Sequence, residues 1–327
     1  VQLHNLPQNH LDDLDDARQI VKNCDYDSLK LFYDNPSDVL SQLIRTAFVA
    51  GKGRRFIVAD FSAIEARVIA WLADETWRQE AFAAGKDIYC ESASQMFGVP
   101  VVKHGVNGEL RAKGKVAELA CGYGGGVSAL KAFGADKMGL SEMEILDIIE
   151  KWRKRSPHIC TFWRGIEKGV KKAIHHKGSE IAFKHGISFK VEKGLLFITL
   201  PSGRRIAYVK PRVEVEEDFG KESITYMGMI QGKTGASGWG RNYTWGGKLT
   251  ENIVQATARD CLAEAMLRLN SAGLKIVMHV HDEVIIEREE GCGTLQQILE
   301  VMREPIPWAK GLILDADGYT THYYRKD

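Results

Sequence analysis

Apolar and polar residues follow different spacings along the chain, and these spacings predict its helices and strands. Residues 54–60 form a short apolar run that ends at a carboxylate, which is typical of a buried strand, and residues 62–73 follow as a helix. From residue 77 to about residue 176 the pattern is almost wholly helical. Residues 181–245 have the character of strands interrupted by Gly and Pro. A long amphipathic helix over 251–270, begun by Thr250, and a strand–turn–strand over 275–287 complete the pattern.

The first and the last of these strand segments both lead into acidic groups. The two groups lie more than two hundred residues apart in the sequence. A sheet that gathers both strand ends and carries a helical lobe would bring the carboxylates together. We therefore expect one sheet interrupted by a helical insertion.

Composition limits the class of protein. At 327 residues and 44% hydrophobic, the chain can bury one large core or two modest ones. No apolar run approaches the ~18 residues of a membrane span, and the first ten residues lack the layout of a signal peptide. The six cysteines include no Cys-x-x-Cys pair, which argues against a disulfide framework or a zinc ribbon and favours a reducing cytoplasm.

Charge is unevenly distributed, although the net charge of +1 indicates no partner by itself. Between residues 151 and 185 there are ten Lys or Arg, opposed only by Glu167 and Glu180. Trp152, Phe162 and Trp163 are interleaved with them, as on a surface that contacts phosphates and bases. The alternative is a solvated helix face whose aromatic residues point into the core. The sequence leaves both interpretations open.

The first candidate site is the segment ADFSAIEAR, residues 59–67. Asp60 stands where the predicted strand ends, a place where a carboxylate reaches solvent and a metal, although such an Asp is often a simple turn residue. Ser62 and Glu65 have the spacing of a capping box, in which both side chains bind N–H groups at the start of a helix. Spacing alone favours this capping role for Glu65.

The second candidate site is the segment HVHDEVIIE, residues 279–287. Asp282 and Glu283 are expected in the tight turn between two apolar strands, where they repel each other unless a cation or a base is near. His279 and His281 are expected on one strand face, as in the beginning of a zinc site. No third ligand can be named, which argues against zinc.

The third candidate site is the segment RAKGKVAELACGYGGG, residues 111–126. At helical spacing Arg111, Lys115, Leu119 and Tyr123 lie along one side and span about 18 Å. The cationic N-terminal end suits a polyphosphate, and the apolar end suits a sugar and a base. The alternative is an amphipathic helix with snorkelling cations. Residues 228–234 look like a P-loop but are one residue short of its spacing and have no helix behind them.

In their order along the chain and in their spacing, residues 59–67, 111–126 and 279–287 resemble motifs A, B and C, respectively, of the family A DNA polymerases of the bacterial polymerase I type. Further matches are QLHNLPQ with a palm strand, FAAGKDIYCESASQMFGVP with the segment leading into the fingers, and LPSGRRIAY with a fingers hairpin. The segment TWGGKLTENIVQATARD resembles a variety found in bacteriophages and prophages. The resemblance implies an α+β right-hand fold, with an antiparallel-sheet palm over 1–72 and 246–327 and mainly helical fingers over 73–245.

The resemblance also implies template-directed DNA synthesis, in which dNTPs are added to the 3′-hydroxyl of a primer–template DNA. Asp60, Asp282 and the backbone carbonyl of Phe61 would hold two Mg²⁺ ions, with Mn²⁺ as a possible replacement. One ion would lower the pKa of the 3′-hydroxyl, and the other would brace the triphosphate. Arg111 and Lys115 would bind the phosphates, and Lys115 would protonate the leaving group.

The remaining site residues are likewise implied by the resemblance. Glu65 would act as a steric gate against a 2′-hydroxyl, and Tyr123 would lie beside the nascent pair when the fingers close. Leu119 replaces the usual aromatic residue of motif B, and Tyr89 replaces a histidine that reaches the phosphates, so both belong to the implied dNTP site. Glu283 is included with the catalytic residues near the primer terminus, and the DNA contacts would be His281, Gln255, Arg259 and Asn5.

The resemblance leads to three further expectations. The thumb and the proofreading exonuclease are expected to be missing from this sequence, upstream of its first residue. A phage- or prophage-encoded enzyme would act in the cytoplasm of a bacterial cell. Two alternatives are a single-subunit RNA polymerase, whose motifs would lack Glu65 and Glu283, and a catalytically weak DNA-binding remnant, which would have lost Asp60 or Asp282.

Overall fold

The computed structural model describes residues 6–7, 9–215, 222–231 and 237–325. The chain divides into two compact units, each made of separate stretches of sequence. The first unit comprises residues 1–62, 261–304 and 314–327, and the second comprises residues 63–260 and 305–313. The predicted palm and fingers ranges have other boundaries than these two compact units, so they stay a prediction.

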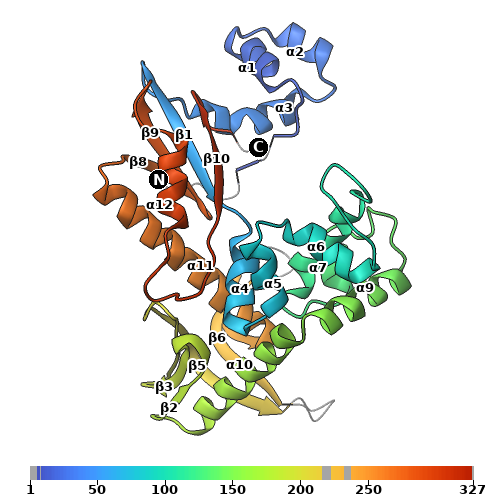
Figure 1. Cartoon of the computed structure of the whole chain (residues 1–327), viewed down its shortest axis with the longest axis vertical. Coiled ribbons are helices and arrows are strands. Elements are labelled where there is room, and N and C mark those ends of the chain that lie inside the picture. Colours follow the sequence, from blue (N-terminus) through green and yellow to red (C-terminus); the bar gives the residue numbers. More distant parts are fainter. Residues whose placement is uncertain (1–5, 8, 216–221, 232–236, 326–327) are drawn as a thin grey trace. The chain divides into compact units, whose positions relative to one another are not determined.

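The first unit is built on a four-stranded antiparallel sheet in the order β10–β1–β9–β8 (Figure 1). Its strands are β1 (Arg54–Phe61), β8 (Ile276–Val280), β9 (Glu283–Glu289) and β10 (Ala316–Thr321). The apolar middle of β1 is buried because it lies between β9 and β10 in the sheet, and α12 (Leu295–Arg303) packs on β1 and β10. The predicted strand over 54–60 and the strand–turn–strand over 275–287 are confirmed.

Short helices complete the first unit. They are α1 (Leu14–Lys22), α2 (Tyr26–Phe32), α3 (Pro36–Leu43) and the 3₁₀ turn η1 (Ile44–Ala47). Leu14, Leu29 and Val39 are buried in a small core that these helices share. Asp25 and Asn35 begin α2 and α3 because each side chain accepts a hydrogen bond from a backbone N–H of the first turn.

The second unit contains the long helical stretch that the sequence predicts. Its helices are α4 (Ile64–Ala73), α5 (Thr76–Ala83), α6 (Ile88–Phe97), α7 (Leu110–Cys121), α8 (Val127–Ala132), α9 (Glu142–Arg155) and α10 (Pro157–His175). Trp152, Phe162 and Trp163 are buried on α9 and α10, while most of the Lys and Arg around them are exposed. The aromatic residues of the basic stretch therefore belong to the core, and the interpretation of an interleaved aromatic surface is wrong for these three.

A six-stranded antiparallel sheet in the order β2–β3–β4–β5–β6–β7 follows these helices, in agreement with the predicted strands over 181–245. The strands are β2 (Glu180–Ala182), β3 (Ser188–Glu192), β4 (Leu195–Thr199), β5 (Arg205–Val215), β6 (Glu222–Gln231) and β7 (Ser237–Thr244), with the 3₁₀ turn η2 (Lys184–Gly186) after β2. α10 packs on β2, β3 and β5. Part of the P-loop-like segment, residues 232–234, lies outside the described residues.

The last long helix, α11 (Gly246–Ser271), begins five residues before the predicted first helical residue, Glu251. Thr250 is not its first residue, because its hydroxyl donates to the carbonyl of Gly246 inside the first turn and its side chain is fully buried. Gly246 itself is required by packing, since an added Cβ would lie 2.2 Å from the Trp163 carbonyl oxygen. The boundary between the two units falls within α11.

Candidate active site

The acidic strand ends of the first unit meet where β1 lies beside β9. Asp60 is the next-to-last residue of β1, and its partner in the antiparallel register is Glu283, the first residue of β9. The backbone N–H of Phe61 donates to the Asp282 carbonyl oxygen at 3.4 Å. The sheet thus brings together the two carboxylate segments that lie far apart in sequence, as the strand pattern predicts.

Asp282 lies in the turn that joins β8 to β9. Val280 pairs with Glu283, so the connection consists of His281 and Asp282 alone. His281 has a φ of 52°, in the left-handed region that such two-residue turns require. Two expectations are therefore corrected. Glu283 belongs to the strand rather than the turn, and His279, inside β8, does not share a strand face with His281 in the turn.

Glu283 is held by a chain of buried polar groups. Its carboxylate accepts a hydrogen bond from the Tyr324 hydroxyl at 2.7 Å, and Arg45 donates to the same hydroxyl at 3.0 Å. Arg45 in turn donates to the carbonyl oxygens of Leu6 and Pro7. Burial and the neighbouring Glu283 carboxylate raise the pKa of Tyr324, so this hydroxyl stays a donor at neutral pH. Tyr324 and Arg45 therefore fix the orientation of Glu283, a role that no sequence motif indicated.

The donor set at this edge fits a hard divalent cation. The backbone pairing at this edge brings together the segments that carry Asp60 and Asp282, and carboxylate and carbonyl oxygens are the ligands that Mg²⁺ prefers. Within residues 6–7, 9–215, 222–231 and 237–325, no group of three or more His, Cys, Asp or Glu side chains has the geometry of a closed metal site. An ion held by two carboxylates keeps positions open for water and for substrate oxygens.

The cationic stripe of the second unit is formed largely as predicted. Arg111, Lys115 and Leu119 recur every four residues on α7, and Leu119 is 38% exposed. Tyr123 lies two residues beyond the end of α7, in the turn that follows the helix. The helix sits close to α6 because Gly114 has no side chain: an added Cβ would lie 2.1 Å from the Tyr89 carbonyl oxygen.

Arg111 is fixed in place by Asp87. Two guanidinium nitrogens of Arg111 lie 2.9 and 2.8 Å from Oδ2 of Asp87. The other oxygen of Asp87 accepts from the backbone N–H groups of Tyr89 and Cys90 and so begins α6. Burial acts to raise the pKa of Asp87, but the hydrogen bonds from Arg111 and the backbone outweigh it, so the pKa is lowered. The Arg111 guanidinium also lies 5.2 Å from the centre of the Tyr89 ring.

Lys115 differs from Arg111 in having no ion-pair partner among the described residues, and its side chain is exposed. One turn further along α7, Glu118 is buried. A buried group of donors surrounds the Glu118 carboxylate: Arg78 in a two-fold ion pair, Ser92 at 2.6 Å and the Trp152 indole at 2.8 Å. This network anchors α7 to α5, α6 and α9. An acidic residue in an amphipathic helix is the only sign of it in the sequence.

Glu65 does not cap α4. The residue before the helix is Ala63, with a left-handed φ of 51°, and no side chain caps this helix start. The Glu65 carboxylate instead accepts a hydrogen bond from the Tyr123 hydroxyl. Burial and the Glu65 carboxylate raise the pKa of Tyr123 well above its ordinary value, so the phenol stays protonated. The capping-box interpretation is therefore wrong, and Glu65 is directed toward the turn that follows α7.

The predicted DNA contacts are less well defined. Gln255 is exposed and Arg259 is half-buried on α11, and His281 is exposed in its turn. Asn5 lies outside the described residues. Nearby on α11, Asp260 accepts hydrogen bonds from Ser202 and Arg204 of the Ser-Gly-Arg turn, which fixes that turn against the helix.

This fold and these two groups of residues define a class of protein. Residues 36–188 match the family model described as DNA polymerase family A. With the relatives given next, this match shows that the chain belongs to DNA polymerase family A.

The relatives are polymerases of phages and bacteria. The DNA polymerase of Bacillus phage SP02 is 51% identical to this chain over all 327 residues. The thermostable DNA polymerase I of Thermus aquaticus is 27% identical over 83% of the chain. The chain spans 50% of the phage protein and 27% of the bacterial one.

A solved structure supports the fold. The POL domain of Pol1 from M. smegmatis, in complex with DNA primer-template and dNTP, matches with a TM-score of 0.57. It is 24% identical, over 86% of this chain and 42% of that one. This likeness confirms the predicted α+β right-hand fold. None of the helices in the described part of the chain combines the length and the apolar character that a membrane span requires.

Proposed function

We propose that this chain carries the nucleotide-adding centre of a template-directed DNA polymerase. The observation that carries the proposal is the pairing of β1 with β9, which holds Asp60 beside the segment that contains Asp282. Two carboxylates, one at a strand end and one in the turn that leads into the adjacent strand, suit a two-metal nucleotidyl transfer. The names of the relatives, all DNA polymerases, support the same reaction.

Asp60 and Asp282, with the backbone carbonyl of Phe61, would hold two Mg²⁺ ions, or Mn²⁺ in their place. When bound, these ions supply Lewis acidity that favours ionisation of the primer 3′-hydroxyl and neutralises charge on the phosphates. Glu283 lies beside Asp60 in the sheet, and its hydrogen bond from Tyr324 keeps its carboxylate turned inward. It acts near the primer terminus by electrostatics rather than as a fixed metal ligand.

The residues on and around α7 would bind the incoming dNTP. Lys115 is exposed and without an ion pair among the described residues, so it can bind the triphosphate and donate a proton to the leaving group. Arg111 exchanges its contact with Asp87 for phosphate oxygens. Leu119 and Tyr123 pack against the sugar and the base, and Tyr89 supports Arg111 through its ring.

Glu65 is the proposed gate for the sugar. Its carboxylate is fixed by the Tyr123 hydroxyl, so it has little freedom to move away from a 2′-hydroxyl. His281, Gln255 and Arg259 are the proposed contacts with the primer–template, together with Asn5. The enzyme would act in the cytoplasm of a bacterial cell, as a phage or prophage product.

The test is extension of a primed template by the chain, with dNTPs compared against rNTPs. The proposal predicts template-directed addition of dNTPs that requires a divalent metal, and poor use of rNTPs. Preference for rNTPs would favour a single-subunit RNA polymerase. DNA binding without any addition would favour a non-catalytic remnant.

A further inference from the structure

The basic stretch of α9 and α10 forms one wall of a continuous groove within the second unit. A cavity of ≈ 1000 Å³ is lined by Arg153, Lys154 and Arg164 together with Trp163 and Trp245. A second cavity of ≈ 610 Å³ is lined by Arg164, Lys168, Lys171 and Lys172 together with His175 and His176. The two cavities share Arg164 and Glu167, so they adjoin along α10.

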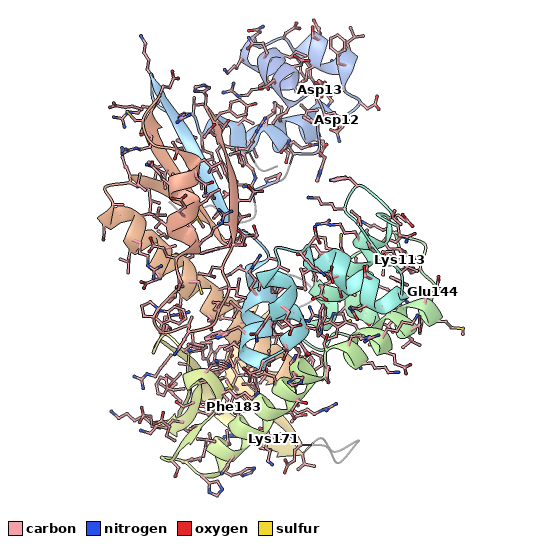
Figure 2. All side chains as sticks on the ribbon, viewed as in Figure 1. Asp12, Asp13, Lys113, Glu144, Lys171 and Phe183 are labelled. Atoms are coloured by element: carbon pink, nitrogen blue, oxygen red, sulfur yellow. The ribbon has the colours of Figure 1, made fainter. Side chains whose placement is uncertain are left out.

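The groove carries an excess of positive charge that the protein itself does not neutralise. Six Lys or Arg line it, against the three acidic residues Glu150, Glu167 and Glu222. Lys171 is paired with Glu167 at 3.0 Å (its side chain is labelled in Figure 2). Arg164, Lys168 and Lys172 are exposed and form no ion pair with the described residues. They recur every four residues, so they place a cation on one face of α10 at intervals of about 6 Å.

An exposed aromatic residue stands at the other end of the groove. Trp245 is 47% exposed, and its ring is fixed from behind, because an added Cβ on Gly124 would lie 2.6 Å from the ring. Gly124 follows Tyr123 directly, and Arg153 donates to the next carbonyl, that of Gly125, at 3.2 Å. The groove therefore starts at the turn after α7 and leads away from it along α10.

We propose that this groove binds single-stranded DNA, specifically the template strand that has not yet been copied. A row of cations suits the phosphates of a strand, and a rigid exposed indole suits an unpaired base. Paired bases of a duplex are not available to stack on Trp245, and an acidic peptide has no base to stack. The choice of the template strand rests on the proposed function, which puts Tyr123 beside the nascent pair and thus the next template base beside Trp245.

The experiment measures the affinity of the chain for primer–template DNA whose 5′ template overhang is either one nucleotide or about 12 nucleotides, within the site sizes of single-strand binders. The wild type should bind the long overhang more tightly. Lys168→Gln/Lys172→Gln should lose this gain and keep its affinity for the one-nucleotide overhang. The matched control is Lys22→Gln/Lys30→Gln, which removes two exposed lysines of the first unit and should keep the gain.

Salt dependence gives the expected size of the effect. Losing two phosphate contacts on a single strand makes the slope of log affinity against log salt concentration shallower by about 1.4. The ratio of wild-type affinity to groove-variant affinity for the long overhang should therefore fall about sevenfold between 50 and 200 mM salt. Trp245→Ala should also reduce the overhang gain, and Trp245→Phe should keep most of it because an aromatic face remains.

Three results would overturn the proposal: an affinity independent of overhang length, an equal loss in the groove variant and the control, or a gain produced only by a 5′ flap on the non-template strand. A different ligand, an acidic peptide, would be indicated by two results together. Poly-glutamate would displace the long-overhang DNA from the wild type, and the groove variant would bind DNA as tightly as the wild type does. Single-nucleotide insertion on the one-nucleotide overhang tests the proposed function separately, because that substrate leaves the groove empty.

Discussion

The hydrogen bond between Tyr123 and Glu65 gives a sharp test of sugar selection. If the bond fixes the Glu65 carboxylate as a gate, Tyr123→Phe should weaken discrimination against rNTPs even though Glu65 is still present. A hydrogen bond to a charged group contributes about 1.5–3 kcal/mol. If that whole amount orients the gate, the ratio of kcat/KM for dNTP over rNTP should fall about 10- to 150-fold.

Two variants of Glu65 complete the test. Glu65→Ala removes the side chain and should lower the ratio at least as far as Tyr123→Phe. Glu65→Gln keeps the shape and still accepts a hydrogen bond, so it should retain most of the discrimination and serves as the matched control. Because no side chain caps α4, none of these changes should cost the ~1 kcal/mol of a lost helix cap.

The assay is steady-state insertion of a single nucleotide opposite one template base, with each dNTP and its rNTP counterpart, alongside urea unfolding of each variant. An unchanged dNTP:rNTP ratio in both Glu65→Ala and Tyr123→Phe would refute the reasoning. A fall in stability with no change in the ratio would return Glu65 to a purely structural role.

Three further predictions concern groups around α7 and the second sheet. Glu118→Gln leaves the fully buried Arg78 without its ion-pair partner and should lower the free energy of unfolding, measured in urea, by about 3–5 kcal/mol. Adding Arg78→Met should recover part of this loss, and an unchanged unfolding midpoint in Glu118→Gln would contradict the prediction. Asp87→Asn keeps the cap of α6 but removes the charge that pairs with Arg111, so KM for dNTP should fall with little change in kcat. A rise in KM would instead argue that Asp87 holds Arg111 in its binding position. Burial raises the pKa of Tyr208 to about 12, so its contribution to stability is complete below pH 10 and is lost as the pH rises toward 12; alkaline unfolding of Tyr208→Phe should be less steep in this range.

Periodicity and motif spacing predicted much of this molecule. The apolar run before Asp60 and the strand–turn–strand around Asp282 are local patterns, and the need to bury both strands in one sheet brings them together. The stripe of Arg111 and Lys115 likewise follows from helical spacing on α7. These features could be predicted because each depends on residues that are close in sequence, or on the pairing of two strands that must both be buried in the same sheet.

Side-chain partners that come from distant segments could not be predicted in this way. The Ser62 and Glu65 spacing is compatible with a cap, but the backbone at Ala63 is left-handed and the carboxylate binds Tyr123 instead. The same limit applies to Tyr324, which reaches Glu283 from near the end of the sequence. Nor does spacing say which face of a helix is buried when both faces carry large side chains, so the aromatic residues of the basic stretch were open to two interpretations.

The central claim, that Asp60 and Asp282 are the carboxylates of a two-metal centre, is tested most directly by single-turnover insertion of one nucleotide at saturating Mg²⁺. Asp60→Asn and Asp282→Asn should each lower the rate about 10²- to 10³-fold, since metal stabilisation of the transition state is worth several kcal/mol, while DNA affinity stays close to that of the wild type. Asp317→Asn is the matched control, because Asp317 is exposed and faces Asp60 from the other neighbouring strand, β10, yet has no assigned role. Near wild-type insertion by Asp282→Asn, or an equal loss in Asp317→Asn, would contradict the account.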